Sequence, residues 1–520
     1  MELTELFTKI LTNETLVGEM HDVTVGINND IQVYTSSIAK NNGCVFFIGK
    51  ANSEKILYII SDRSDNKLSE QFEGTSINFS NSKESLNIKK CPLTTKNRKS
   101  LQNIFKYTIA VPLGLNNSFG CGDRIGFANA GHIRSLAGTK FKPILAQQSI
   151  RELTRTNRTP DEVMDAAVWA VFQEGYKDGF GSDGDHLKTP ADIDYLLAAG
   201  FTMFTFDPGE HVDNEADNYS ESELTENVAK LPWSELKDSP SDAESRYTNK
   251  EIIISDEFIL NISRLDILKA LAKYGKAIAH IKKMYEHLKT KGTEGKYEVE
   301  VSVDETESVT SPFEHYFVVS ELIRLGVKFI SLAPRFVGSF EKGIDYKGDL
   351  DLFKTEYKKH LAVVKHFGNY KISLHSGSDK FSVYKVIGLL REAVTHVKTA
   401  GTSYLEALRV VAAKSPDLFR EIFNFATGLY EEEKKSYHVS ADIKRVKNAN
   451  DYSDAELLGL FDSVDGRQIL HVTFGKVLST KKENGEFLFK DKIITCLKEN
   501  EATHYNFIIK HFHKHLEPFN

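Results

Sequence analysis

The sequence predicts an α/β protein with a TIM-barrel-like (β/α)8 core and an N-terminal accessory α+β region. From about residue 118, short β-type runs alternate with amphipathic helical stretches, which is the rhythm of βαβ units in a parallel sheet. Polar and charged clusters follow the ends of these runs. In a TIM barrel the catalytic groups gather at the C-terminal ends of the strands, so these clusters are where we expect a site.

Composition divides the chain into three regions. Residues 1–117 are rich in Asn, Ser and Lys and contain short β-type runs, so we predict an accessory α+β region there. Residues 118–470 carry the barrel pattern, and an acidic, polar insertion at about 213–250 interrupts it as a surface loop or lid. Residues 471–520 form a C-terminal extension that packs on the barrel, with a β-like run at 471–474 and a final helix over 504–516. We expect that helix to expose its histidines.

The barrel elements follow in order along the chain. The predicted strands are 124–129, 175–181, 201–207, 297–304, 328–334, 371–375 and 393–398. Three of the intervening helices begin with an N-cap residue, a proline at the first helical position and an early acid. These starts are Thr159-Pro160, Thr189-Pro190 and Ser311-Pro312.

The overall composition is that of a globular protein that acts on small polar molecules. The 520 residues are 41% apolar and 27% charged. The net charge is −7 and the pI is near 6.2, so the chain lacks the excess of positive charge that would favour binding to nucleic acid or to an anionic membrane. The four cysteines are far apart and form no CxxC pair, which favours a cytoplasmic location. No apolar run is long enough to cross a membrane. A homo-oligomer is compatible with this composition.

The run 179–189, Gly-Phe-Gly-Ser-Asp-Gly-Asp-His-Leu-Lys-Thr, is the most distinctive segment of the chain. Its glycines let the backbone approach a ligand, and its acids would gain little from burial in an apolar core. Asp185 next to His186 could place a general base beside a metal ligand. We therefore predict that this run forms the mouth of an active site.

Other histidines could complete a metal site. His375 ends an apolar run and begins a loop of small polar residues, whereas His315 lies in the first turn of a predicted helix; each could equally be a structural histidine. His211 follows another predicted strand and is a reserve ligand. Histidines and carboxylates from separate loops suit an open divalent site for Zn, Mn, Ni or Co.

Acids alternate with valines over 297–304. In a barrel the valines would face the surrounding helices and the acids would face the polar centre. Glu305 lies just beyond this strand and could lean over the rim, which gives it a slight preference over Asp304 as a second acid or base.

Several cations lie at predicted rim positions and could bind a substrate carboxylate. These cations are Lys188, Arg335, Lys342, Lys380 and Lys398, and each could instead be a surface charge. Lys188, Arg335 and Lys398 are the predicted substrate-binding residues among them. Thr402 lies in a turn before a predicted helix, where backbone N–H groups could bind an anion or serve as an ordinary cap.

Taken together, these motifs resemble the tagaturonate epimerase family over about 119–516. The motifs that carry the resemblance are 122–126, 131–134, 179–189, 207–213, 303–306 and 397–405. Membership would imply a metal-dependent interconversion of D-tagaturonate and D-fructuronate at C4. The resemblance also implies Asp185 as proton acceptor, Glu305 as donor, and His186, His315 and His375 as metal ligands.

The chemistry of such a substrate favours a retro-aldol route. C4 is β to the C2 ketone, so its C–H proton is not acidified by enolate formation. Cleaving and re-forming the C3–C4 bond after removal of the O4 proton avoids this problem. Two other readings share the same residues: another metal-dependent ketose isomerase or aldolase on a barrel, and a sugar-acid binding protein that performs no reaction.

Overall fold

A closed barrel of eight parallel strands forms the centre of the protein in the computed structural model, which confirms the predicted fold class. The described residues are 23–27, 29–61, 67–80, 85–368, 370–390, 392 and 394–520. The order around the barrel is β10, β11, β14, β15, β16, β17, β8 and β9. Their bounds are β8 (Ser118–Cys121), β9 (Lys142–Ser149), β10 (Gly181–Leu187), β11 (Met203–Phe206), β14 (Glu298–Val303), β15 (Ser331–Pro334), β16 (Lys371–Leu374) and β17 (Thr395–Thr399).

The first three barrel strands differ from the prediction. Residues 124–129 are not a strand, because the Asp123 carboxylate accepts hydrogen bonds from the backbone N–H groups of Ile125, Gly126 and Ala128 and folds the chain into a loop. β8 precedes this loop, and β9 was not predicted at all. β10 begins where strand 175–181 was expected to end, so the acidic, glycine-rich run itself forms the strand.

Helices surround the barrel as predicted. Capping boxes begin α6, α7 and α12 at Thr159, Thr189 and Ser311, each followed by proline, so these three predicted starts are confirmed. The helices of the barrel region are α4 (Asn129–Leu136), α5 (Ile150–Thr156), α6 (Pro160–Gln173), α7 (Pro190–Ala199), α11 (Arg264–Lys291), α12 (Pro312–Arg324), α13 (Leu350–His366), α14 (Phe381–Leu390) and α15 (Thr402–Lys414).

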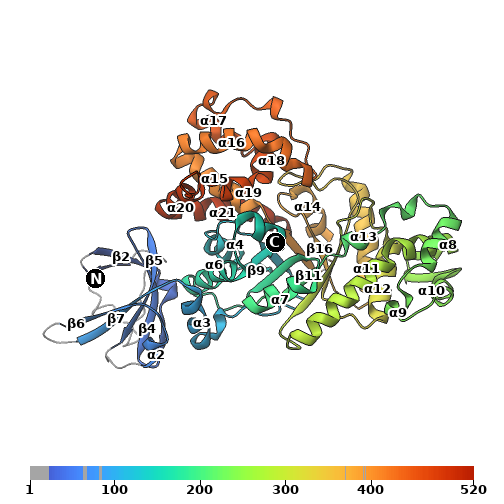
Figure 1. Cartoon of the computed structure of the whole chain (residues 1–520), viewed down its shortest axis with the longest axis horizontal. Helices are drawn as coiled ribbons and strands as arrows, with labels where there is room; N and C mark the ends of the chain where they lie inside the picture. The colour runs from blue at the N-terminus through green and yellow to red at the C-terminus, as the bar shows by residue number, and fades with distance from the viewer. Residues whose placement is uncertain are drawn as a thin grey trace.

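The acidic insertion is folded, not a solvated loop. It contains η4 (Asn214–Asp217), α8 (Glu221–Ala229), α9 (Trp233–Leu236), α10 (Pro240–Tyr247) and the hairpin of β12 (Lys250–Ser255) and β13 (Phe258–Ile262). Leu224 and Val228 are buried, and Glu321 of α12 accepts hydrogen bonds from Arg246 (2.8 Å) and Tyr247 (2.6 Å). Its helices lie at the far end of the molecule from the N-terminal sheet (Figure 1). Composition missed them because their few apolar residues are spaced on one face.

An antiparallel sheet forms the N-terminal region. Its bounds are β1 (Val23–Ile27), β2 (Asn29–Val33), β3 (Ala39–Asn41), β4 (Cys44–Ala51), β5 (Glu54–Ser61), β6 (Thr75–Ser80) and β7 (Ser85–Pro92), and α2 (Lys67–Glu70) and α3 (Thr95–Ile104) accompany it. Phe105 packs against Phe46 of the sheet (ring centroids 5.2 Å apart) and against Phe172 of α6 (5.5 Å). The apolar core of the sheet is therefore continuous with the helical shell of the barrel.

The C-terminal region, which begins with α16, is built from helices. It contains α16 (Pro416–Glu433), α17 (Asp454–Gly459), α18 (Val464–Val472), α19 (Phe474–Ser479), α20 (Lys490–Glu499) and α21 (Glu501–Leu516). The β-like run predicted at 471–474 is wrong, because these residues join α18 to α19. No helix among the described residues is both long and apolar enough to cross a membrane.

The final helix was predicted correctly. The prediction that it exposes its histidines holds for His513 but is wrong for the other three. His504, His511 and His515 are buried against the barrel. His511 Nε2 lies 2.5 Å from Asp379 Oδ1, and Arg467 contacts the other oxygen of that carboxylate at 2.6 Å. The Asp379 backbone N–H donates to His515 Nε2. Asp379, His511 and His515 therefore form a satisfied structural network that joins α21 to the loop after β16.

Glu501 at the start of α21 connects the N-terminal sheet to the rest of the protein. It pairs with Lys50 (2.9 Å) and Lys55, and it accepts a hydrogen bond from Tyr34 (2.6 Å). Burial opposes its ionisation, but Lys55 and Lys50 outweigh this effect and hold the pKa of Glu501 below its usual range. The ionised carboxylate therefore stabilises the contact between the two regions.

We predict that Glu501→Gln lowers the free energy of unfolding by about 3 kcal/mol at pH 7, because Lys50 and Lys55 lose their counter-charge at a mostly buried position. Because the folded-state pKa is depressed, this contribution is present above the unfolded pKa and the difference from wild type shrinks below about pH 4. Urea unfolding followed by tryptophan fluorescence measures it. Glu499→Gln, at an exposed position of the neighbouring helix, is the control. Equal midpoints for both variants would contradict the role given to Glu501.

Candidate active site

β10 carries the most distinctive segment of the chain into the barrel. Asp183 and Asp185 are buried, and Gly184 lies on the opposite face against Leu196, where a Cβ would come within 2.4 Å of the leucine side chain. The strand register shifts between Gly184 and Leu187, and His186 takes a left-handed backbone conformation (φ 51°). This irregularity turns the His186 ring towards the barrel mouth beside Asp185 instead of into the outer helices.

A buried lysine occupies the polar centre of the barrel. Lys398 Nζ lies 2.7 Å from Asp183, 2.9 Å from Asp185 and 2.7 Å from Glu300, and it donates to Thr205 Oγ1 at 2.6 Å. Burial opposes ionisation of Asp185, but Lys398 and the neighbouring imidazoles hold its pKa below the usual range. Asp185 is therefore kept as a carboxylate, fixed in position by a charge-assisted hydrogen bond.

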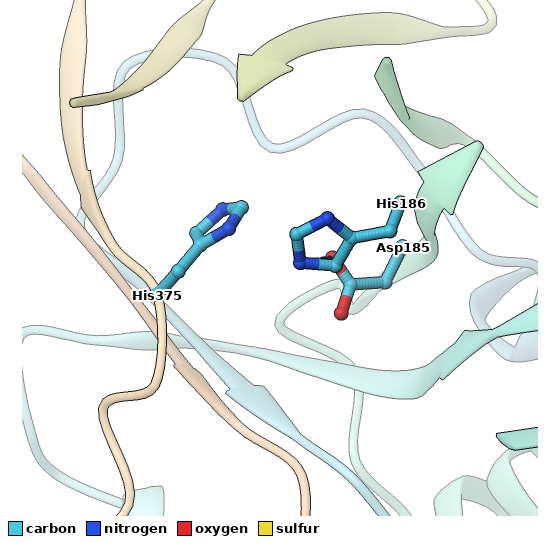
Figure 2. Close-up of side chains that lie close together, drawn as sticks. All are labelled: Asp185, His186 and His375. Carbon is cyan, nitrogen blue, oxygen red and sulfur yellow. Dashed lines mark ion pairs between the residues drawn. The ribbon is translucent and has the colours of Figure 1, made fainter. Parts of the chain in front are cut away.

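Two imidazoles face each other above this network (Figure 2). The rings of His186 and His375 are 5.0 Å apart between centroids and nearly perpendicular. His375 Nε2 lies 2.6 Å from Glu300 and its Nδ1 3.2 Å from Asp304. His186 Nε2 lies 3.7 Å from Asp185, while its Nδ1 lies 3.3 Å from Asp207 and 3.9 Å from Glu305. Predicted residues from separate strands and loops therefore meet at one point.

The chemistry of this cluster fits a divalent metal ion. One ligand atom from each of Asp185, His186 and His375 lies within 4.8 Å of the others, and the same is true of His186, Asp207 and Glu305. The Nδ1 atoms of both histidines and Oδ2 of Asp207 are buried, and none of them makes a well-aligned hydrogen bond to a described residue despite the close carboxylate contacts given above. Although burial disfavours protonation, the surrounding carboxylates raise the pKa of His186 to about 9 and that of His375 to about 10, which marks an excess of negative charge. A divalent cation would balance it.

The structure does not bring His315, the third predicted metal ligand, to this cluster. It is fully buried on α12, where its Nδ1 lies 2.9 Å from His360 Nδ1 and Tyr370 OH lies 2.6 Å from its Nε2. Both ring nitrogens are thus engaged outside the barrel. The helix begins as predicted, but its register directs His315 towards α13 and not towards the barrel mouth. The reserve ligand His211 stacks on His280 and is also outside the groups of potential ligands.

The predicted substrate-binding residues lie in different surroundings. Arg335 lines a cavity of about 230 Å³ at the barrel mouth together with His186, His375 and Glu305. Lys188 pairs with the exposed Glu210 at 2.8 Å, and Lys398 is neutralised inside the barrel by its carboxylates. Thr402 is buried at the start of α15, and no described residue forms a hydrogen bond with its hydroxyl group.

Arg151 and Lys342 line the site but were not among the predicted site residues. Both contribute to the cavity that contains Arg335 and to a smaller one that contains Asp185 and Lys398. Arg151 follows β9 directly, so recognising 142–149 as a strand would have placed it at the rim. Lys342 follows β15 in the loop before α13, and its position marks it as one of the predicted rim cations.

Comparisons with known proteins agree with this architecture. The family UxaE, tagaturonate epimerase, matches residues 34–519. The chain is 41% identical over 490 residues to the tagaturonate/fructuronate epimerase of Thermotoga maritima, covering 94% of this chain and 96% of that protein. It also resembles the native crystal structure (TM-score 0.86) and a glycerol complex (TM-score 0.87) of fructuronate-tagaturonate epimerase UxaE from Cohnella laeviribosi, with 36% identity and 99% coverage of each chain in both cases.

The resemblance inferred from the motifs is therefore confirmed over nearly the whole chain. The match includes the N-terminal sheet from residue 34 and the folded insertion, neither of which contributed a motif. The chain belongs to the tagaturonate epimerase family, a family of isomerases.

Proposed function

We propose that this protein interconverts D-tagaturonate and D-fructuronate by inverting C4, and that the reaction depends on a divalent metal ion. The observation that carries the proposal is the meeting of Asp185, His186 and His375 at the C-terminal mouth of the barrel. The 41% identity to the Thermotoga maritima epimerase supports the choice of substrates. We place the activity in the cytoplasm, in keeping with four buried cysteines that form no disulfide.

A retro-aldol reaction accounts for inversion at a carbon whose C–H proton is not acidic. Removal of the O4 proton lets the O4 electrons form a C4 aldehyde while the C3–C4 bonding pair moves into an enediolate over C3 and C2. Rotation of the aldehyde presents its other face, and the enediolate carbon then attacks it to re-form the C3–C4 bond. A proton returns to O4, so atoms and electrons balance and no redox partner is needed.

Asp185 is suited to take the O4 proton. Its carboxylate is ionised and held by Lys398, and it lies at the cavity boundary beside His186. A base must reach the substrate hydroxyl and be deprotonated before the bond breaks, and both conditions are met by a buried carboxylate paired with a fixed ammonium. Lys398 therefore acts on Asp185 as a positioning residue.

Glu305 is suited to return the proton from the other side. It approaches His186 Nδ1, whereas Asp185 approaches Nε2, so the two carboxylates flank the imidazole from opposite edges. Asp304 is a weaker donor, because His375 and Ser302 engage it and, despite burial, hold its pKa below the usual range. Glu305 is partly exposed and lies 3.9 Å from His186 Nδ1, which supports the slight preference given to it by the sequence.

His186 and His375 would hold the metal ion, and Asp207 would supply an oxygen ligand. When bound, such an ion provides Lewis-acid stabilisation of negative charge on substrate oxygens. Zn, Mn, Ni and Co all suit a site of imidazoles and carboxylates. His315 is not part of this proposal, because His360 and Tyr370 engage both of its ring nitrogens.

We predict that the metal-loaded protein converts D-tagaturonate into D-fructuronate in an NMR assay, and that substrate deuterated at C4 keeps its label. The label stays because the retro-aldol route never breaks the C4–H bond. Loss of deuterium to solvent during turnover would exclude this route in favour of proton abstraction, and absence of fructuronate would overturn the proposed function itself.

We predict that chelation abolishes turnover and that adding back a divalent metal restores it. His186→Ala and His375→Ala should each lower bound metal, measured by elemental analysis, because each removes one imidazole ligand. His315→Gln should keep its metal, as should the control His287→Ala, whose ring pairs with Asp194 on the exterior. Metal loss in His315→Gln, with the folded fraction matched by circular dichroism, would return His315 to the ligand set.

We predict that Asp185→Asn lowers kcat by at least about 100-fold while the metal content stays near that of wild type, because the amide cannot accept the O4 proton. Asp178→Asn is the matched control, since Asp178 is exposed just before the other end of the same strand. An Asp185→Asn variant with wild-type turnover would remove Asp185 from the catalytic role.

A further inference from the structure

Two cations at the barrel mouth are not held in a close ion pair. Within the part of the chain that the structure describes, Arg151 and Lys342 form no ion pair with any carboxylate, although both line the cavities that contain His186 and His375. Lys342 Nζ donates to Ser376 Oγ at 2.7 Å. Burial and the neighbouring Arg151 together lower the pKa of Lys342, so the two charges are close enough to repel each other.

Most other cations near the site are already neutralised or fully hydrogen-bonded. Arg335 is the exception: it forms no ion pair with a described residue, but it lines the larger cavity and not the smaller one. Lys398 contacts its carboxylates, Arg124 pairs with Glu152 at 2.9 Å, and Arg467 pairs with Asp379. Lys380 donates to three backbone carbonyl groups. An anion that enters the larger cavity would therefore find Arg151, Lys342 and Arg335 free to bind it. Of these three cations, Arg151 and Lys342 also line the smaller cavity, which contains Asp185 and Lys398.

The elements that carry the two cations position them next to the reacting centre. Arg151 lies in the first turn of α5, directly after β9, and its guanidinium lies 5.6 Å from the centre of the Tyr437 ring. Lys342 is attached through its hydrogen bond to Ser376, the residue that follows His375. A carboxylate held between them would lie within one small molecule's length of the two histidines, since all four side chains line the same cavities.

Neutral polar groups in the smaller cavity suit a hydroxylated ligand. Gln147 and His471 both line it and are buried. Neither the amide atoms of Gln147 nor Nδ1 of His471 has a hydrogen-bond partner among the described residues. Buried polar groups are rarely left unpaired, so these atoms point to a ligand that carries hydroxyl groups as well as a negative charge.

We propose that Arg151 and Lys342 bind the carboxylate of the sugar-acid substrate and so select hexuronates over neutral ketohexoses. The inference rests on the proposed function and names the residues that decide its substrate class. Arg151 can offer two parallel N–H donors to the carboxylate, and Lys342 adds a point charge. A neutral ketohexose carries a hydroxymethyl group at that end, which would leave both cations without a partner.

Binding by an unreactive analogue tests the proposal without relying on turnover. The full-length, metal-loaded protein is titrated calorimetrically with L-galactonate and with galactitol, which carries a hydroxymethyl group in place of the carboxylate. Wild-type protein should bind L-galactonate more tightly than galactitol. Arg151→Met and Lys342→Met should each weaken the binding of L-galactonate by roughly 100-fold. Each variant should change the binding of galactitol by less than about threefold. Lys354→Met, at an exposed position of α13, is the matched control.

Kinetics provide the second readout. We expect both variants to raise KM for D-tagaturonate more than they lower kcat, and Lys342→Arg to restore part of the loss because it keeps the charge. Aldonate binding within threefold of wild type in both variants would overturn the inference. Wild-type protein that binds the aldonate but produces no fructuronate would instead overturn the proposed function and leave the carboxylate site standing.

Discussion

The ammonium group of Lys398 is the charge on which the interior of the barrel depends. Asp183, Asp185 and Glu300 project into a closed barrel where water cannot screen them, and their mutual repulsion would be severe without a cation between them. Lys398 comes from β17, across the barrel from the strands that carry the acids. The same contact that makes burial of these acids tolerable also keeps Asp185 ionised, so stability and reactivity have one origin.

The mouth of the barrel shows the opposite arrangement, in which charges are left unbalanced. Carboxylates surround His186 and His375, and some buried polar atoms there make no hydrogen bond to any residue that the structure describes, while Arg151 and Lys342 form no close ion pair with those residues. Such an arrangement costs stability in the free protein. It is the pattern expected where a metal ion and an anionic substrate supply the missing partners, and it separates a binding site from the satisfied network below it.

The regions outside the barrel contribute by holding its loops in place. Asp379 lies four residues after His375, and its contacts with Arg467 and His511 connect that loop to the C-terminal helices. Lys380 reinforces the same loop through backbone carbonyls, including those of Glu341 and Ile344 next to Lys342. The proposed metal-binding histidine and the proposed substrate-binding lysine are thus supported by one set of contacts.

Local patterns in the sequence determined three features of the protein. They are the helix starts at Thr159, Thr189 and Ser311, the inward-facing acids of 297–304, and the placement of Asp185 beside His186. Each depends only on residues that are near neighbours along the chain. Only the tertiary structure decided which distant residues converge. Lys398 meets Asp185 across 213 positions, and His315 turns away to His360. Barrel closure and helix packing fix these contacts, and no local spacing encodes them.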